Sequence, residues 1–461
     1  MTDPETKETI TEDEYIRRQG KVPLKQNLFR MILKNLMGQY RGNSGKSIVL
    51  SRMINDDGGS EMLTNAIHHV HQLNYMDELD ARNIEEFALS GMAISKVNYS
   101  YYKTRDEEDV KIKNVNPNRF FCNSDIQDIR GEDVRIIGEL IDMTLDDVIG
   151  SFAKSPADEE KIKRLYSISR SDFMAYTGFN SRDIDSLSFY LPDDPSKARV
   201  FEVWQIRSEW RMKVHDWADG TYKTYKVTKG QIEAMNAERI AFGIQNGLQP
   251  EEIPLLEAEP IKEQFWYVKF LTPHGHTLFE SETPYDHEEH PYAFIAYPLL
   301  DGDVWGFMED IIDQQKYVNR MVTMMDFVLS ASAKGVLMIP EDMIPANMSP
   351  EQFAAEWRNF NGVIVYKPST KHNAVPQQIK SNSTVVGLTE MLQLQMQFVN
   401  DISGIHSAIQ GKSASAGTPA SLYAQEAQNA ATNTLDFFHT YGFYQQKRDD
   451  KILKLVLQYY Q

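Results

Sequence analysis

Two long stretches toward the C-terminal end of the 461-residue chain carry apolar residues at helical spacing. The first covers 305–333, and no residue in it breaks a helix before Gly335. A helix of that length spans roughly 40 Å, at about 1.5 Å per residue. The second stretch covers 385–409. The pattern therefore predicts two long helices that flank a shorter segment, 335–380.

Prolines divide this flanked segment into short pieces. The pieces are two strand candidates, GVLMI at 335–339 and GVIVY at 362–366, with a helix led by Pro350 between them. Proline cannot continue a helix or pair inside a sheet, so these pieces are expected to be short. The segment is thus predicted to be a small α/β module.

Small residues dominate 411–421, GKSASAGTPAS, and this composition predicts a loop or hinge. A final helix is predicted from residue 422 onward. It reaches residue 461 without a stop signal, so we expect the natural chain to continue.

Residues 24–298 mix helical and strand periodicity and are predicted to form one α+β body with an insertion. Thr144 is expected to cap one of its helices. Residues 155–198 carry little periodicity, and 251–259 are expected to be an acidic loop. The helices are expected at 24–40, 60–90, 142–152 and 229–246, and the strands at 97–102, 110–115, 200–211, 221–227, 265–270 and 277–280.

The charge balance is acidic, with 48 basic and 66 acidic residues and a formal net charge of −18. A protein that coats duplex DNA is usually basic, because its affinity comes from neutralising phosphates. The balance argues against tight, static binding but permits a channel through which DNA slides. The single cysteine, Cys122, excludes an intrachain disulfide and favours a cytosolic compartment. No stretch of about 18 apolar residues predicts a membrane span.

Two features resemble catalytic motifs but lack their requirements. Gly42–Ser47 has two residues between its glycines, whereas a phosphate-binding P-loop needs four and follows a buried strand. It is interpreted as an ordinary loop. Cys122 follows two phenylalanines, and a lone cysteine in such a setting is more often a small buried side chain than a nucleophile.

The histidines do not form a recognisable metal motif. His287 and His290 are three residues apart and Pro291 follows, so no helix presents them together. His68 and His71 can share a helix face, but no carboxylate or cysteine completes a ligand set nearby in sequence. No catalytic, cofactor or metal site is therefore predicted.

Several segments, in this order, resemble portal proteins of tailed bacteriophages, particularly the long podovirus type also found in crAss-like phages. Each segment is short, and the order is the specific part of the resemblance. The region 155–260 matches no part of that pattern. The matching segments are NLMGQYR at 35–41, the helix-glycine-strand unit EEFALSGMAISKVNYSYY within 60–102, NVNPNRFFCNSD at 114–125, the stretch 290–326, and VNDISGIHSAIQG followed by SASAGTPASLYAQEA.

The resemblance implies a portal-like subunit with a mixed α/β wing, two long stem helices and a small α/β clip. A crown that follows in family members is absent or not included. The expected segments are a flexible arm at 1–23, the wing at 24–300 with an elaboration at about 155–260, stem helices at 301–334 and 381–410, the clip at 335–380, a tunnel loop at 411–421, and a wing helix at 422–461.

The resemblance also implies a structural, non-enzymatic role without cofactors. Twelve copies would form a ring at one capsid vertex, the channel through which double-stranded DNA is packaged and ejected. The expected partners are the large terminase, the major capsid protein and head–tail adaptor or tail proteins, with no membrane. The protein would belong to the virion and to the host cytoplasm during assembly. Another virion structural protein, such as an adaptor or minor capsid protein, and an undetected cytosolic enzyme are the alternatives.

On that resemblance, three groups of residues are candidate contacts. Carboxylates and amides in a channel repel or lubricate duplex DNA, while lysine and arginine rings prevent complete rejection; alternatively, these side chains face solvent or neighbouring subunits. The channel-lining candidates are Glu309, Asp313, Lys316, Arg320, Lys334, Gln393, Gln397 and Asn400. The tunnel-loop candidates are Lys412, Ser413, Ser415, Gly417 and Thr418. The clip candidates for partner contacts are Glu341, Asp342, Glu351, Arg358 and Lys367.

Overall fold

The computed structural model divides the chain into two compact units, which we describe separately. The helix-pair unit comprises 1–39 and 308–435, and the sheet unit comprises 40–307 and 436–461. The described residues are 10–18, 22–43, 45–51, 58–102, 106–167, 189–218, 220–245, 249, 253–297, 299–300, 303–334, 336–358, 365–367, 377–379, 386–404, 432 and 434–460.

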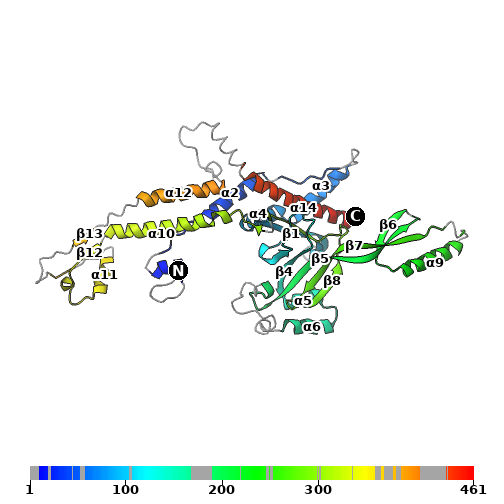
Figure 1. Ribbon diagram of the computed structural model, residues 1–461, viewed down its shortest axis with the longest axis horizontal. Coiled ribbons are helices and arrows are strands. Elements are labelled where there is room, and N and C mark those ends of the chain that lie inside the picture. The colour runs from blue at the N-terminus through cyan, green and yellow to red at the C-terminus, as the bar shows by residue number, and fades with distance from the viewer. Residues whose placement is uncertain are drawn as a thin grey trace, which may run out of the picture. The chain divides into compact units, whose positions relative to one another are not determined.

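Antiparallel strands build the sheet unit (Figure 1). One sheet has the order β2-β1-β9; the larger one has the order β3-β4-β5-β7-β8, with β6 added beside β5. The strands of these sheets are β1 Met92–Tyr102, β2 Glu107–Asn114, β3 Phe120–Cys122, β4 Ile136–Thr144, β5 Lys197–Asp216, β6 Thr221–Tyr225, β7 Leu256–Leu271, β8 Thr277–Glu282 and β9 Tyr292–Ala296. A small ribbon pairs β10 Leu299–Leu300 with β11 Asp303–Val304.

Helices pack against these sheets. They are α3 Gly59–Leu73, α4 Met76–Ser90, the 3-10 helix η1 Pro117–Arg119, α5 Leu145–Phe152, α6 Pro156–Tyr166, α9 Lys229–Gln245 and α14 Leu435–Tyr459. One core cluster joins α3 and α14 to the first sheet and includes Ile67, Val97 and Ile452. A second includes Ile94, Ile137 and Trp204, and it joins the two sheets. The predicted α+β class is confirmed.

The first predicted hairpin is confirmed. Strands β1 and β2 pair from Ser95↔Asn114 to Tyr102↔Glu107. The predicted cap of α5 is also confirmed, because the Thr144 hydroxyl accepts the Asp147 N–H and the Asp147 carboxylate accepts the Thr144 N–H. This helix begins at Leu145 rather than at 142, since 142–144 belong to strand β4.

The prediction of one helix over 60–90 is wrong. The segment forms α3 and α4, separated at Asn74 and Tyr75, where Tyr75 has a φ of 52°. The buried Asn74 amide donates to the carbonyl oxygens of Val70 and Val110 and accepts from the N–H of Ile112. These bonds to β2 offset the helical bonds lost at the break.

Strands β5 and β7 are longer than predicted. They pair continuously from Phe201↔Leu271 to Asp216↔Leu256, so part of the expected acidic loop at 251–259 is a strand. The hairpins β5–β6 and β7–β8 are confirmed, as is helix α9. Strands β3, β4 and β9 and the short ribbon β10–β11 were not predicted. Within the weakly periodic 155–198, helix α6, which the Ser155 hydroxyl caps, was not predicted either.

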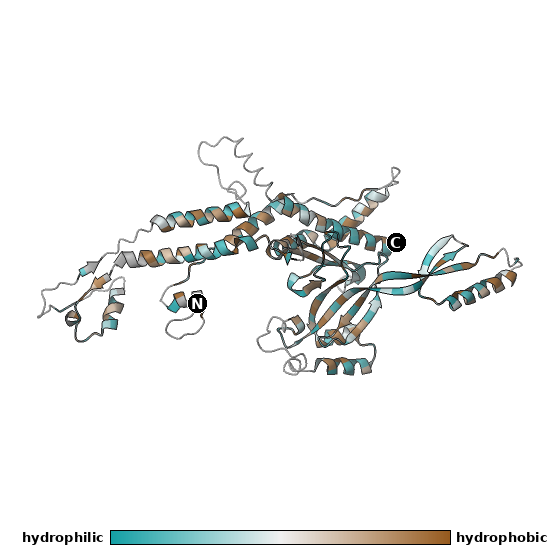
Figure 2. Cartoon of the chain, viewed as in Figure 1, coloured by the Kyte–Doolittle hydropathy of each residue, from teal (hydrophilic) through white to brown (hydrophobic). Residues whose placement is uncertain are grey.

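The helix-pair unit contains two long helices, α10 (Ile312–Lys334) and α12 (Val386–Ser403), that pack side by side and run in opposite directions (Figure 1). Brown apolar and teal polar residues alternate along both (Figure 2). Its described elements are α1 Glu12–Arg18, α2 Leu28–Asn43 (of which 40–43 fall in the sheet unit), η3 Glu309–Ile311, α10 Ile312–Lys334, β12 Val336–Met338, η4 Glu341–Met343, α11 Pro350–Arg358, β13 Gln377–Ile379 and α12 Val386–Ser403.

The first long helix begins later than predicted, at Ile312 instead of 305. The reason lies in the sheet unit, where the backbone of 305–306 contacts the turn between α4 and β1. A Cβ on Gly306 would lie 2.1 Å from the Leu89 carbonyl oxygen, and one on Gly91 would lie 2.3 Å from that of Trp305. That close backbone contact leaves no room for a helix at these positions.

The shorter segment between the long helices, 335–380, differs from its prediction in which strands pair. The expected helix led by Pro350 is present as α11. Strand β12 pairs with β13, at 377–379, and not with the candidate at 362–366. Of that candidate, Val365 and Tyr366 are described and are not in a strand; the rest lies outside the described residues.

The second long helix is described from Val386 to Ser403, and 405–409 of its predicted range lie outside the described residues. The same holds for the whole predicted loop at 411–421 and most of 422–434. Among the described residues, no helix is long and apolar enough to cross a membrane.

Candidate functional site

The α10–α12 pair carries the predicted channel-lining residues. Ile311, Val318, Met321 and Val399 are buried along the pair. Because residues three, four and seven apart share a helix face, Asp313, Lys316 and Arg320 lie on the face of α10 opposite Ile311 and Val318. All three charged side chains are exposed. α10 is thus amphipathic, with one buried apolar face and one charged face.

The charges on this face partly compensate one another. Lys316 Nζ lies 3.3 Å from Asp313 Oδ1, and both side chains are largely exposed. Glu309 is also exposed and precedes α10 in η3. The Lys334 side chain lies outside the description. Which of these residues line a channel stays a prediction.

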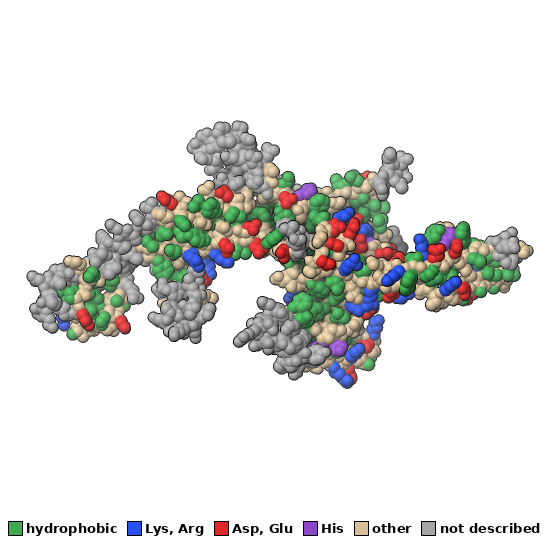
Figure 3. Space-filling model, in the orientation of Figure 1, with side chains coloured by type: hydrophobic (Ala, Val, Ile, Leu, Met, Phe, Trp, Pro, Cys, Tyr) green, Lys and Arg blue, Asp and Glu red, His purple; other side chains and the backbone are tan. Residues whose placement is uncertain are grey.

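Helix α12 has three distinct faces. Val399 and Ser403 are buried. Gln393 and Gln397 are exposed, and Asn400 is half-buried. A third face carries large apolar side chains that remain 42–45% exposed: Met391, Leu394, Phe398 and Ile402. These four recur at i, i+3, i+7 and i+11 and so form a second apolar stripe, distinct from the buried one. Figure 3 shows green apolar side chains gathered over α10 and α12.

An amide cluster attaches the segment before α2 to α10. The buried Gln315 side chain accepts the N–H of Leu28 at 2.8 Å and donates to the carbonyl oxygen of Gln26. Asn319 Oδ1 accepts the N–H of Gln26 at 2.9 Å. Gln315 thus satisfies one of the N–H groups that the start of a helix leaves without an intrahelical partner.

The remaining predicted contacts are only partly described. Glu341, Glu351 and Lys367 are exposed, and the N–H of Lys367 donates to Met343 O at 3.0 Å. The side chains of Asp342 and Arg358 lie outside the description. The tunnel-loop candidates also lie outside the described residues: Lys412, Ser413, Ser415, Gly417 and Thr418.

The histidines that sequence reasoning examined occupy packed positions. His68 Nε2 lies 2.9 Å from Ser47 O, and His71 Nε2 lies 3.1 Å from Asp449 Oδ1. Burial lowers the pKa of His287 to about 4. Over the described ranges, no three His, Cys, Asp or Glu side chains are grouped to hold a metal ion. Cys122 is half-buried in β3, and burial raises the pKa of its thiol to about 11.

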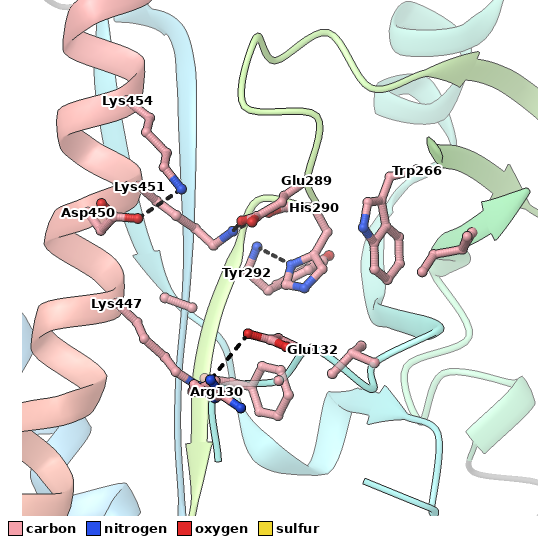
Figure 4. A pocket seen from close by; sticks show the side chains of 15 residues that line it. Arg130, Glu132, Trp266, Glu289, His290, Tyr292, Lys447, Asp450, Lys451 and Lys454 are labelled. Carbon is pink, nitrogen blue, oxygen red and sulfur yellow. Dashed lines mark hydrogen bonds and ion pairs between the residues drawn. The ribbon is translucent and has the colours of Figure 1, made fainter. Parts of the chain in front are cut away.

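Sequence reasoning missed a basic pocket in the sheet unit. Three lysines of α14, Lys447, Lys451 and Lys454, project toward His290, just before β9, and Trp266 of β7 (Figure 4). The cavity has a volume of about 350 Å³. The spacing i, i+4, i+7 places the three lysines on one helix face and was visible in the sequence. The facing residues come from segments more than 150 positions away, which no local pattern indicates.

Comparison with known proteins agrees with this architecture. A family model described as "Phage P22-like portal protein" matches residues 6–461. The chain therefore belongs to the family of P22-like portal proteins of tailed phages. No curated protein sequence matches it. The narrower likeness to crAss-like phages stays a prediction.

Membership of the family sets the general role. Portal proteins are structural, non-enzymatic components of the virion, which form rings at the portal vertex of the capsid. The family assignment decides against both alternatives considered from the sequence, an adaptor or minor capsid protein and a cytosolic enzyme.

Proposed function

We propose that the chain forms the DNA channel of the portal ring, with α10 and α12 as the channel-lining stem helices and 335–380 as the clip. During packaging the clip would contact the large terminase, and afterwards it would contact adaptor or tail proteins. Residues 24–300 would form the wing beside the major capsid protein. Residues 411–421 would be the tunnel loop, and the assembled ring would contain about twelve subunits.

The observation that carries this proposal is the second apolar stripe of α12. A helix that only packed against α10 would need one apolar face. The stripe of Met391, Leu394, Phe398 and Ile402 is left exposed in the single chain. Exposed apolar patches of this kind usually mark an interface. In a ring, each subunit contacts its two neighbours through two different surfaces. The stripe of each subunit can therefore pack against the other surface of its neighbour, and every stripe in the ring is buried.

The polar faces support the channel part of the proposal. Gln393 and Gln397 on α12, together with Asp313, Lys316 and Arg320 on α10, offer amides and both signs of charge. Repetition around a ring turns each side chain into a belt. Carboxylate and amide belts prevent tight phosphate binding, and belts of Lys316 and Arg320 keep the duplex from being repelled.

Phe398→Glu tests the stripe. A carboxylate at an apolar subunit contact must be desolvated, so we expect no rings at concentrations at which the unmodified chain assembles completely. Native mass spectrometry and negative-stain electron microscopy measure the assembly. Circular dichroism should show a folded chain, because Phe398 is 42% exposed in the single subunit.

Gln397→Glu is the matched control, since it places the same carboxylate one residue away on the polar face. We expect this variant to form rings. Normal rings of the Phe398 variant would overturn the assignment of the stripe as a subunit contact. Loss of rings in the Gln397 variant alone would place the interface on the polar face instead.

A further inference from the structure

The basic pocket of the sheet unit has more positive than negative side chains, although the chain as a whole is acidic. Four cationic side chains line it, against three carboxylates, in a protein with a net charge of −18. The cations are Arg130, Lys447, Lys451 and Lys454, and the carboxylates are Glu132, Glu289 and Asp450. A local excess of positive charge in a concave site concentrates anions there.

The cations retain unused donors. Lys451 Nζ donates to Glu289 Oε2 at 2.8 Å and to His290 O at 2.9 Å, which leaves one of its three hydrogens. Lys447 Nζ donates to the Ile129 carbonyl oxygen. Burial lowers the pKa of both lysines, a penalty that a bound anion would relieve.

Three of the four carboxylates that pair with these cations are held loosely. The fourth, Asp128, accepts the Nε–H of Arg130 at 3.2 Å and is only 24% exposed. The side chains of Glu132, Glu289 and Asp450 are 71%, 50% and 56% exposed, whereas that of Lys451 is only 9% exposed. Ion pairs with an exposed partner contribute little to stability. A ligand anion can therefore replace Glu132, Glu289 and Asp450, which can move into solvent without a large cost.

His290 adds a neutral hydrogen-bond donor to the wall of the cavity. Its ring is buried, and its Nδ1 accepts the N–H of Tyr292 at 3.2 Å. Burial holds its pKa well below the usual value, so the imidazole is neutral and its proton is on Nε2. Within the described part of the chain, Nε2 has no protein hydrogen-bond partner and is not among the fully buried unpaired atoms, so it reaches the cavity. This N–H can donate to water or to a ligand that enters the cavity.

The other walls of the cavity are apolar. Val134, Ile206, Trp266 and Phe294 line it beside the cations, and the Trp266 ring meets the His290 ring edge-on at 4.8 Å. A volume of about 350 Å³ is large for one inorganic ion, given that a water molecule occupies about 30 Å³ in the liquid. The ligand should therefore combine an anionic group with an organic body.

We propose that this pocket binds a small phosphate ester, with the phosphate held by Arg130, Lys447, Lys451 and the Nε2–H of His290 and the organic body against Trp266. Phosphate fits better than carboxylate, because its three terminal oxygens can accept from several charged donors at once. The site lies within the sheet unit and adds a ligand-binding role to the structural one.

Isothermal titration calorimetry of the full chain with adenosine 5′-monophosphate as the probe tests the proposal. We expect one ligand per chain, and no heat with adenosine, which lacks the phosphate. Lys451→Met and Arg130→Gln should each raise Kd about tenfold, the loss of one charge-assisted contact. Arg130 is 72% exposed, so its variant should fold even if the Lys451 variant does not.

Lys262→Met is the matched control, because Lys262 is an exposed lysine of β7 that does not line the cavity. Its Kd should equal that of the unmodified chain. Absence of binding at millimolar concentration, or a Kd unchanged in both pocket variants, would overturn the site. Equal affinity for succinate would overturn the choice of phosphate, and equal affinity for inorganic phosphate would overturn the choice of an ester.

Discussion

The sheet unit buries charged side chains in closed networks, whereas the α10–α12 pair leaves apolar side chains exposed. In the sheet unit, Arg448 donates to the carboxylates of Asp80 and Asp449, and all three are buried. In the helix-pair unit, Phe398 and its stripe remain more than two-fifths exposed. The buried charges of the sheet unit are neutralised within the chain. The exposed apolar stripe of α12 can be removed from water only by a partner. Single apolar side chains of the sheet unit are exposed too, such as Trp210 at 71% and Phe242 at 68%. The stripe of α12 differs from these in its regular helical spacing, which suits it to assembly.

A second buried network strengthens the comparison. Lys96 of β1 donates to Glu139 of β4 at 2.8 Å and also to Glu202 of β5. Trp204 Nε1 donates to Glu202 at 2.8 Å. These bonds join the two sheets through charge as well as through the apolar cluster around Ile94. Buried pairs contribute little net stability but become costly when one partner is removed.

The largest effect is expected from Met321→Pro in α10. Proline removes a backbone hydrogen bond and clashes with the preceding turn, at a cost of about 3 kcal/mol or more. Since Met321 is buried along the helix pair, we expect ring assembly to be lost while the sheet unit, 40–307 and 436–461, keeps its fold. Native mass spectrometry reports the rings, and limited proteolysis with peptide mapping reports the fold. Met321→Leu serves as control, and normal rings in the proline variant would contradict a stem role for α10.

Arg448→Met tests whether the buried charge network stabilises the sheet unit. It leaves the buried carboxylates of Asp80 and Asp449 without their cation, so we expect about 3–5 kcal/mol less stability. Urea unfolding followed by tryptophan fluorescence measures the change. Arg164→Met, on an 81% exposed side chain, should stay within about 0.5 kcal/mol. Equal stabilities of the two variants would show that the buried network is not what holds this unit together.

Local features of the sequence were sufficient to predict many elements of the fold. The Thr144 cap and the β1–β2 hairpin depend on residues within a few positions of one another, and both were predicted. The break at Asn74 was not predicted, because its hydrogen-bond partners lie on β2, 36 and 38 residues away. The late start of α10 likewise depends on the backbone of Leu89.

The candidate surfaces likewise divide into features that local sequence predicts and features that depend on distant parts of the chain. Periodicity identified α12 as a helix but could not separate its buried face from the exposed stripe of Phe398, because both are apolar. The basic pocket combines Arg130, His290 and Lys451, which only the fold brings together. Charges such as Lys316 were assigned to a channel by family resemblance, because the side chains that face a channel depend on contacts between subunits and not on the periodicity of one helix.

The smallest expected effect is on the stability of the sheet unit at low pH. It concerns Asp449, one member of the Arg448 network. Burial by itself would raise the pKa of Asp449, but bonds and charges from His71 and Arg448 lower it to about 2. A carboxylate with a depressed pKa stabilises the fold above its unfolded pKa of about 3.8 and loses that contribution as pH falls toward 2. The shift corresponds to about 2 kcal/mol.

Asp449→Asn removes this titration while keeping the shape of the side chain. We expect the variant to be less stable than the unmodified chain by about 2 kcal/mol from pH 5 to 7. The gap should narrow below pH 4, because the unmodified chain then loses the same contribution by protonation. Urea unfolding at stepped pH measures both curves. Asp450→Asn, one position away on an exposed side chain, is the control. A gap that stays constant down to pH 2.5 would assign the stabilisation to packing, not to the charge of Asp449.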